Sequence, residues 1–124
     1  MNKRPVYLNL LRLRLPLMAW VSILHRVTGV LLFLALPVGL YLLQTSLSGQ
    51  AGYAATSALL GRPVARFVIW LMLGSLANHA LAGLRHFAMD LHCGVERNRG
   101  RSSARLVLIA GVFITLAAGW ELFR

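Results

Sequence analysis

Three long runs of apolar residues, separated by short polar stretches, dominate the sequence. They cover residues 27–43, 67–84 and 106–120, and the first extends back to residue 18 with only His25 and Arg26 as interruptions. About 20 helical residues span the hydrocarbon core of a bilayer, and none of the runs alternates apolar and polar positions as a barrel strand does. The pattern predicts an all-α membrane protein that forms a single domain over residues 1–124. The three transmembrane helices are expected at about 20–45, 63–88 and 104–123.

The connections between these helices are predicted from composition. Residues 46–52 are rich in Ser and Gly and indicate a short turn, whereas residues 98–103 are polar and indicate a mobile loop. Gly111, Thr115 and Gly119 recur every four residues and predict close helix packing. Pro37 should kink the first helix. Three helices of this size bury little surface among themselves, so we expect the chain to associate with a partner protein.

The charge distribution indicates a lipid bilayer as the environment and excludes nucleic acid. Only 13% of residues are charged, against about 25% in soluble domains. The net charge of +10 arises from cations that flank the apolar runs. Ten of the 13 lie before or at the start of the first run, or between the second and third: Lys3, Arg4, Arg12, Arg14, Arg26, Arg85, Arg97, Arg99, Arg101 and Arg105. This bias predicts a cytoplasmic N-terminus and a periplasmic C-terminus.

The first candidate site lies at the start of the first helix. Ser22 and Arg26 are one helical turn apart, and His25 lies beside them. A hydroxyl and a guanidinium could hold the carbonyl oxygens of a quinone, and Arg26 would stabilise negative charge without releasing a proton. The alternative is an arginine that snorkels to the interface beside an interfacial histidine.

The second candidate site lies deep in the second helix. His79 is its one ionisable residue within the apolar run, with Gly83 one turn and His86 two turns further on. Haem iron is a natural partner for such an imidazole, and the glycine would leave space for a flat porphyrin. A hydrogen bond from His79 to a neighbouring helix explains the spacing equally well. His92 and the single Cys93 carry no signal of a role.

Several strings in this order resemble a known family. They are Arg4-Pro5-Val6, the SILHRVTGV of residues 22–30, and the HALAGLRH of residues 79–86 followed by Asp90. Together with the three spans they are similar to the cytochrome b subunit of succinate dehydrogenase, over essentially the whole chain. The resemblance implies the bacterial inner membrane and an assembly with a flavoprotein subunit, an iron–sulfur subunit and a second membrane-anchor subunit.

Residue roles follow from the same resemblance. It implies that His79 is an axial ligand of haem b, that His25 and Arg26 meet the haem propionates, and that Ser22 and Arg26 bind ubiquinone. The chain would then be half of a haem-binding helical bundle completed by the second anchor, with no succinate chemistry of its own. It departs from the family pattern in Asn78, where an aromatic residue often precedes the ligand, and in a short tail after the third helix.

Three other functions are compatible with part of the pattern. The chain could be a purely structural, haem-free anchor, or the anchor of a related quinol:fumarate reductase that works in the opposite direction. A small transporter subunit is disfavoured, because the spans lack the intramembrane carboxylates that proton-coupled pathways commonly use and the chain has no internal repeat.

Overall fold

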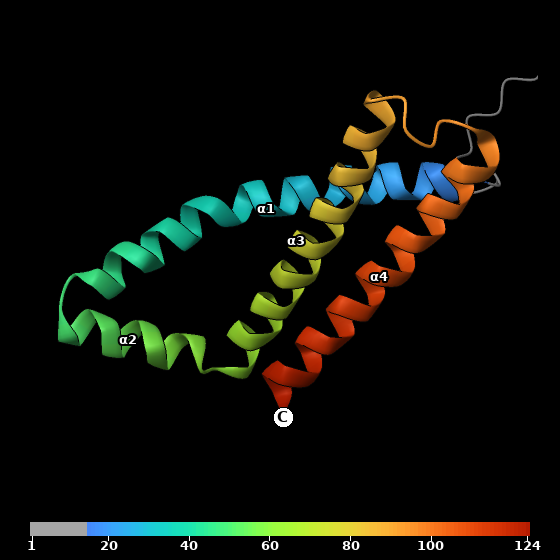
Figure 1. The fold of residues 1–124 in the computed structure, drawn as a ribbon. Helices are drawn as coiled ribbons and strands as arrows, with labels where there is room; N and C mark the ends of the chain where they lie inside the picture. Colours follow the sequence, from blue (N-terminus) through green and yellow to red (C-terminus); the bar gives the residue numbers. More distant parts are fainter. Residues whose placement is uncertain (1–14) are drawn as a thin grey trace, which may run out of the picture.

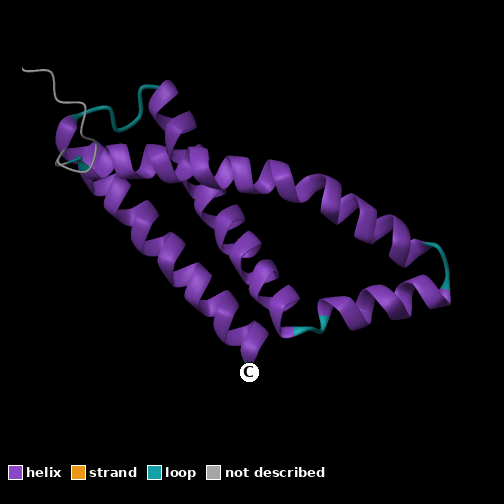
Figure 2. Cartoon of the chain, turned by 180° about the vertical axis from the view of Figure 1, so that it is seen from behind, coloured by secondary structure: helices purple, strands orange, loops and turns teal. Residues whose placement is uncertain are grey.

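The computed structural model describes residues 15–124, and within that range every regular element is a helix (Figures 1 and 2). The elements are α1 (Leu17–Leu47), α2 (Gln50–Leu60), α3 (Pro63–Asp90) and α4 (Arg97–Phe123). Helices α1, α3 and α4 are long and apolar enough to cross a membrane. The prediction of an all-helical chain with three candidate spans is therefore confirmed. Lys3, Arg4, Arg12 and Arg14, and the first of the family-like strings, lie outside the described residues.

Proline and glycine set the limits and the bend of α1. The helix begins directly after the extended Pro16, whose carbonyl accepts a hydrogen bond from the Ala19 amide at 2.9 Å. It continues without a break through Pro37, and its second half curves away from its first (Figure 1). Proline lacks the amide hydrogen that would bond the preceding turn, which permits this bend. The chain then reverses at Gly49, where φ is +131°, a backbone conformation that residues other than glycine rarely adopt.

Two predicted connections are wrong. The turn expected over residues 46–52 is confined to Ser48 and Gly49, because helix α2 starts at Gln50 and connects α1 to α3 (Figure 1). The mobile loop expected over residues 98–103 is helical, because α4 begins at Arg97. Residues 97–103 are helical because of tertiary packing against α3, which residue composition does not reveal.

Arg85 holds the early part of α4 against α3. Arg85 is only 7% exposed, and its guanidinium donates hydrogen bonds to the Ser103 hydroxyl at 3.1 Å and to the Gly100 carbonyl at 3.2 Å. Gly100 itself is buried against Met18 of α1. These contacts order a polar segment that would otherwise resemble a loop.

Helices α3 and α4 lie side by side and antiparallel, joined by close contacts at small residues (Figures 1 and 2). The Trp70 indole donates to the Thr115 carbonyl at 2.8 Å, and Asn78 Nδ2 donates to the Thr115 hydroxyl at 3.3 Å. A Cβ on Gly111 would collide with Asn78 Oδ1, and one on Gly119 would lie 2.8 Å from Trp70 Nε1. The small residues Gly111, Thr115 and Gly119, spaced four apart on α4, thus form the α3–α4 interface.

The chain buries few large side chains. Val21, Ala82 and Ala104, one each from α1, α3 and α4, form the buried apolar core near the α3–α4 loop. By contrast, Phe33 and Phe113 are each 72% exposed. Such an apolar exterior matches a protein that faces lipid and partner helices.

Candidate functional site

Three histidines meet where α1 crosses α3. The His25 ring of α1 stacks on the His79 ring of α3, with 4.1 Å between ring centroids and 14° between planes. His86, two turns along α3, lies 5.2 Å from His25 at a tilt of 53°. All three side chains are half-buried. The structure therefore joins His25 from the first predicted site to His79 from the second in one cluster.

The backbone of α1 orients the His79 imidazole. Its Nδ1 lies 3.0 Å from the His25 carbonyl oxygen, which only accepts hydrogen bonds, so Nδ1 carries the proton. The Thr28 hydroxyl, itself bonded to the Leu24 carbonyl at 2.7 Å, lies 3.3 Å from the same nitrogen. Nε2 has no hydrogen-bond partner among residues 15–124 and presents its lone pair. A histidine held in this way by a carbonyl has the tautomer and fixed ring orientation that metal-ligating histidines require.

Two glycines make room for the stacked rings. A Cβ on Gly29 would lie 2.9 Å from His79 Cε1, so any side chain there would displace the imidazole. A Cβ on Gly83 would lie 3.2 Å from His25 Nε2. The space beside Gly83, which was expected to receive a porphyrin, therefore faces the His25 ring.

Thr28 and Gly29 are site residues to which the sequence analysis assigned no role. Both lie one turn or less from His25, within the family-like string of α1. Their positions in the sequence indicate only which face of the helix they share. Their role becomes visible in the structure, where α1 crosses α3 and brings Thr28 Oγ1 and the Gly29 backbone against His79.

Ser22 and Arg26 flank His25 on α1, Ser22 three residues before it and Arg26 one residue after it. Ser22 is half-buried, Arg26 is exposed, and neither side chain has a hydrogen bond or ion pair within the described part of the chain. The chain contains three acidic residues in all, and two of them, Glu96 and Glu121, already pair with arginines. Within residues 15–124, no ion pair neutralises the Arg26 guanidinium.

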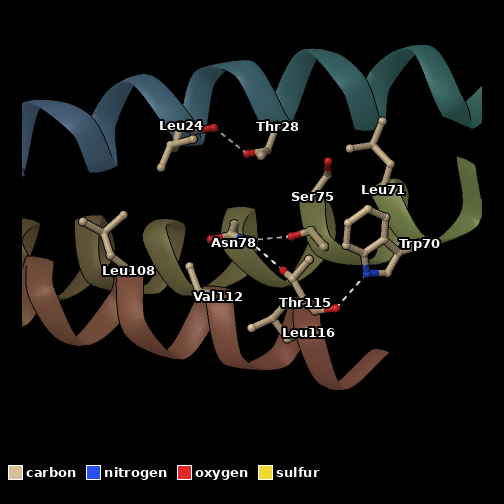
Figure 3. Close-up of a pocket in the computed structure, with 11 residues that line it drawn as sticks. Leu24, Thr28, Trp70, Leu71, Ser75, Asn78, Leu108, Val112, Thr115 and Leu116 are labelled. Atoms are coloured by element: carbon tan, nitrogen blue, oxygen red, sulfur yellow. Dashed lines mark hydrogen bonds between the residues drawn. The ribbon is translucent and has the colours of Figure 1, made fainter. Parts of the chain in front are cut away.

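An apolar groove of about 430 Å³ adjoins the histidine cluster (Figure 3). Thr28 contributes to both, and Ser75 and Asn78 add the few polar groups on its α3 wall. Asn78, although next to His79 in sequence, turns toward α4 and bonds Thr115 (Figure 3). Its amide therefore serves helix packing and lies apart from the histidine rings.

Comparison with known proteins finds relatives among membrane subunits of respiratory complexes. The family described as "Succinate dehydrogenase/Fumarate reductase transmembrane subunit" matches residues 1–118. The chain is 38% identical over 120 residues to the succinate dehydrogenase cytochrome b556 subunit of Coxiella burnetii (strain RSA 493 / Nine Mile phase I), covering 95% of this chain and 96% of that protein. It is 26% identical over 115 residues to the protein of the same name from Paracoccus denitrificans, covering 93% and 88%.

Proposed function

Because the chain belongs to the family of succinate dehydrogenase and fumarate reductase transmembrane subunits, we propose that it is the cytochrome b anchor of a bacterial succinate:quinone oxidoreductase in the inner membrane. The observation that carries the proposal is the His79 imidazole, oriented through Nδ1 by the His25 carbonyl with Nε2 left without a partner among residues 15–124. The hydrogen bond to α1 uses Nδ1 alone and is shared with a haem-free anchor, whereas Nε2 remains available as a ligand.

The donor set of this chain fits haem b. When bound, haem b supplies a one-electron carrier between the iron–sulfur subunit and the quinone. In our proposal His79 provides one axial imidazole, and the second anchor provides the other. In the same proposal His25, which stacks on His79, and Arg26, the next residue of α1, would bind the haem propionates. Gly29 and Thr28 keep the His79 ring in place.

The quinone site involves Ser22 and Arg26. Both belong to one face of α1, and both are free of partners in the described residues, so a hydroxyl donor and a guanidinium remain for two carbonyl oxygens. Reduction of ubiquinone places negative charge on its ring oxygens before protons arrive. A fixed guanidinium stabilises that charge, whereas the protons come from other groups because arginine keeps its own.

The remaining chemistry belongs to partner subunits. Among residues 15–124 no group of three His, Cys, Asp or Glu side chains could hold a metal ion. In our proposal, succinate oxidation and the iron–sulfur clusters belong to the flavoprotein and iron–sulfur subunits, as the family membership implies. The second anchor would cover apolar side chains that this chain leaves exposed on α1, such as Phe33 at 72% and Leu40 at 61%.

Purification of the complex through a tag on this chain tests the proposal. We expect the flavoprotein, iron–sulfur and second anchor subunits to copurify, with the visible spectrum of one haem b and succinate–ubiquinone reductase activity. The same subunits without haem absorbance would identify a haem-free structural anchor. A complex that reduces fumarate with quinol much faster than it oxidises succinate would instead favour the fumarate reductase alternative.

Membrane orientation gives a prediction that is independent of haem. A reporter inserted after Ser48 should read as periplasmic, because residues 45–61 between the first two spans contain no cation. A reporter inserted after Gly94, in the α3–α4 loop next to the arginines, should read as cytoplasmic. Alkaline phosphatase and green fluorescent protein fusions measure the two sides. The reverse pattern would contradict both the orientation and a cytoplasmic quinone site.

A further inference from the structure

Two arginines of α4, Arg101 and Arg105, form an arginine row next to one end of the apolar groove. Arg101 and Arg105 occupy successive turns near the start of α4, and both side chains are exposed. They lie two helical turns before Leu108 and Val112, which line the groove (Figure 3). Because residues seven apart share a side of a helix, the same side of α4 carries first guanidinium groups and then an apolar wall.

The length of α4 places these arginines at the level of lipid headgroups. Its 27 residues extend about 40 Å, whereas the hydrocarbon core of a bilayer is about 30 Å thick. The excess of about 10 Å belongs at the polar start of the helix, since the apolar run begins only at Leu106. Arg101 and Arg105 thus lie in the headgroup layer, with the groove below them in the hydrocarbon.

No ion pair within residues 15–124 neutralises Arg101 or Arg105. Of the three acidic residues, Glu96 binds Arg99 at 3.4 Å, Glu121 binds Arg124 at 2.8 Å, and Asp90 pairs with no arginine in the described part of the chain. An anion supplied from outside would neutralise the two exposed guanidinium groups.

We propose that Arg101 and Arg105 bind the phosphate of an anionic phospholipid whose acyl chain lies in the groove beside Leu108 and Val112. Guanidinium groups form paired hydrogen bonds with phosphate oxygens. The apolar wall favours a lipid over an acidic protein surface, because the face of a water-soluble subunit offers charge but no hydrocarbon to fill a groove of about 430 Å³.

The test uses the assembled complex purified in a neutral detergent, with dioleoyl phosphatidylglycerol and dioleoyl phosphatidylcholine as probes. We would measure bound lipid by native mass spectrometry and the shift in Tm on lipid addition. The variants are Arg101→Gln with Arg105→Gln, and Val112→Trp to fill the groove. Arg99→Gln is the matched control, because it removes one charge from the same segment but from another side of α4, where Arg99 pairs with Glu96.

We expect phosphatidylglycerol to bind and stabilise the wild type and Arg99→Gln, and to bind the double arginine variant at least fivefold more weakly. Val112→Trp should weaken binding although no charge is lost. Equal retention of phosphatidylglycerol in all variants would overturn the proposal. So would loss of the iron–sulfur subunit from the double variant in either lipid, which would identify a protein docking surface. Loss of the second anchor from Val112→Trp in either lipid would show that a helix fills the groove, and would also refute it.

Discussion

Replacing His79 with alanine should abolish the low-spin haem spectrum of the purified complex. In our proposal the His79 Nε2 is one of two axial nitrogens, and the His25 carbonyl holds the ring through Nδ1 at 3.0 Å. Alanine removes the ligand, so the iron retains at most one protein imidazole and becomes high-spin, or the haem is lost. Optical and electron paramagnetic resonance spectra of the assembled complex measure this directly.

His86→Ala is the matched control for that experiment. His86 belongs to the same histidine cluster, 5.2 Å from His25, but no backbone carbonyl orients its ring in the described residues. We expect the His86 variant to keep a low-spin spectrum. A normal bis-imidazole signal in His79→Ala would contradict the assignment, whatever the control shows.

Gly29→Val tests the same site while keeping the ligand. A Cβ at Gly29 would lie 2.9 Å from His79 Cε1, so valine must push the imidazole away from its position. Groups that orient a metal-bound histidine are typically worth about 10–100-fold in affinity. We therefore expect weaker haem retention or a shifted spectrum in the assembled complex.

The spans were predictable from sequence because apolar length alone decides whether a helix can cross a bilayer. The helix over residues 97–103 was not, because its order depends on Arg85 donating to Gly100 and Ser103 from another helix. Helix α2 was missed for a different reason: the Ser/Gly-rich start of its sequence signals a turn, which occupies only two residues, and α2 follows at once.

The sequence indicates which residues are candidates for the site better than it indicates how they are arranged in space. A histidine deep in an apolar run and an arginine at its edge are costly in lipid, so His79 and Arg26 stand out in the sequence. The stacking of His25 on His79, and the clearance at Gly29, depend on where α1 crosses α3. No local pattern encodes that crossing point.

Replacing Arg26 with leucine should lower succinate-dependent ubiquinone reduction by about 10²–10³, the typical cost of losing one donor that stabilises developing negative charge. Ser22→Ala should impair the same activity, since it removes the hydroxyl one turn away on the same face of α1. Succinate oxidation by a soluble dye that accepts electrons upstream should be unchanged in both, because that chemistry belongs to another subunit.

The informative quantity is quinone reductase activity divided by dye reductase activity in membranes that contain the assembled complex. This ratio cancels differences in assembly, which an exposed arginine at a membrane boundary can also affect. Arg26→Lys separates the two roles of the side chain. If Arg26 only snorkels to the interface, lysine restores wild-type behaviour and leucine reduces the amount of complex without changing the ratio. If the guanidinium binds the quinone oxygens, lysine keeps the charge but loses the planar pair of donors, so the ratio stays low. An unchanged ratio in Ser22→Ala and Arg26→Leu would remove the quinone site from α1.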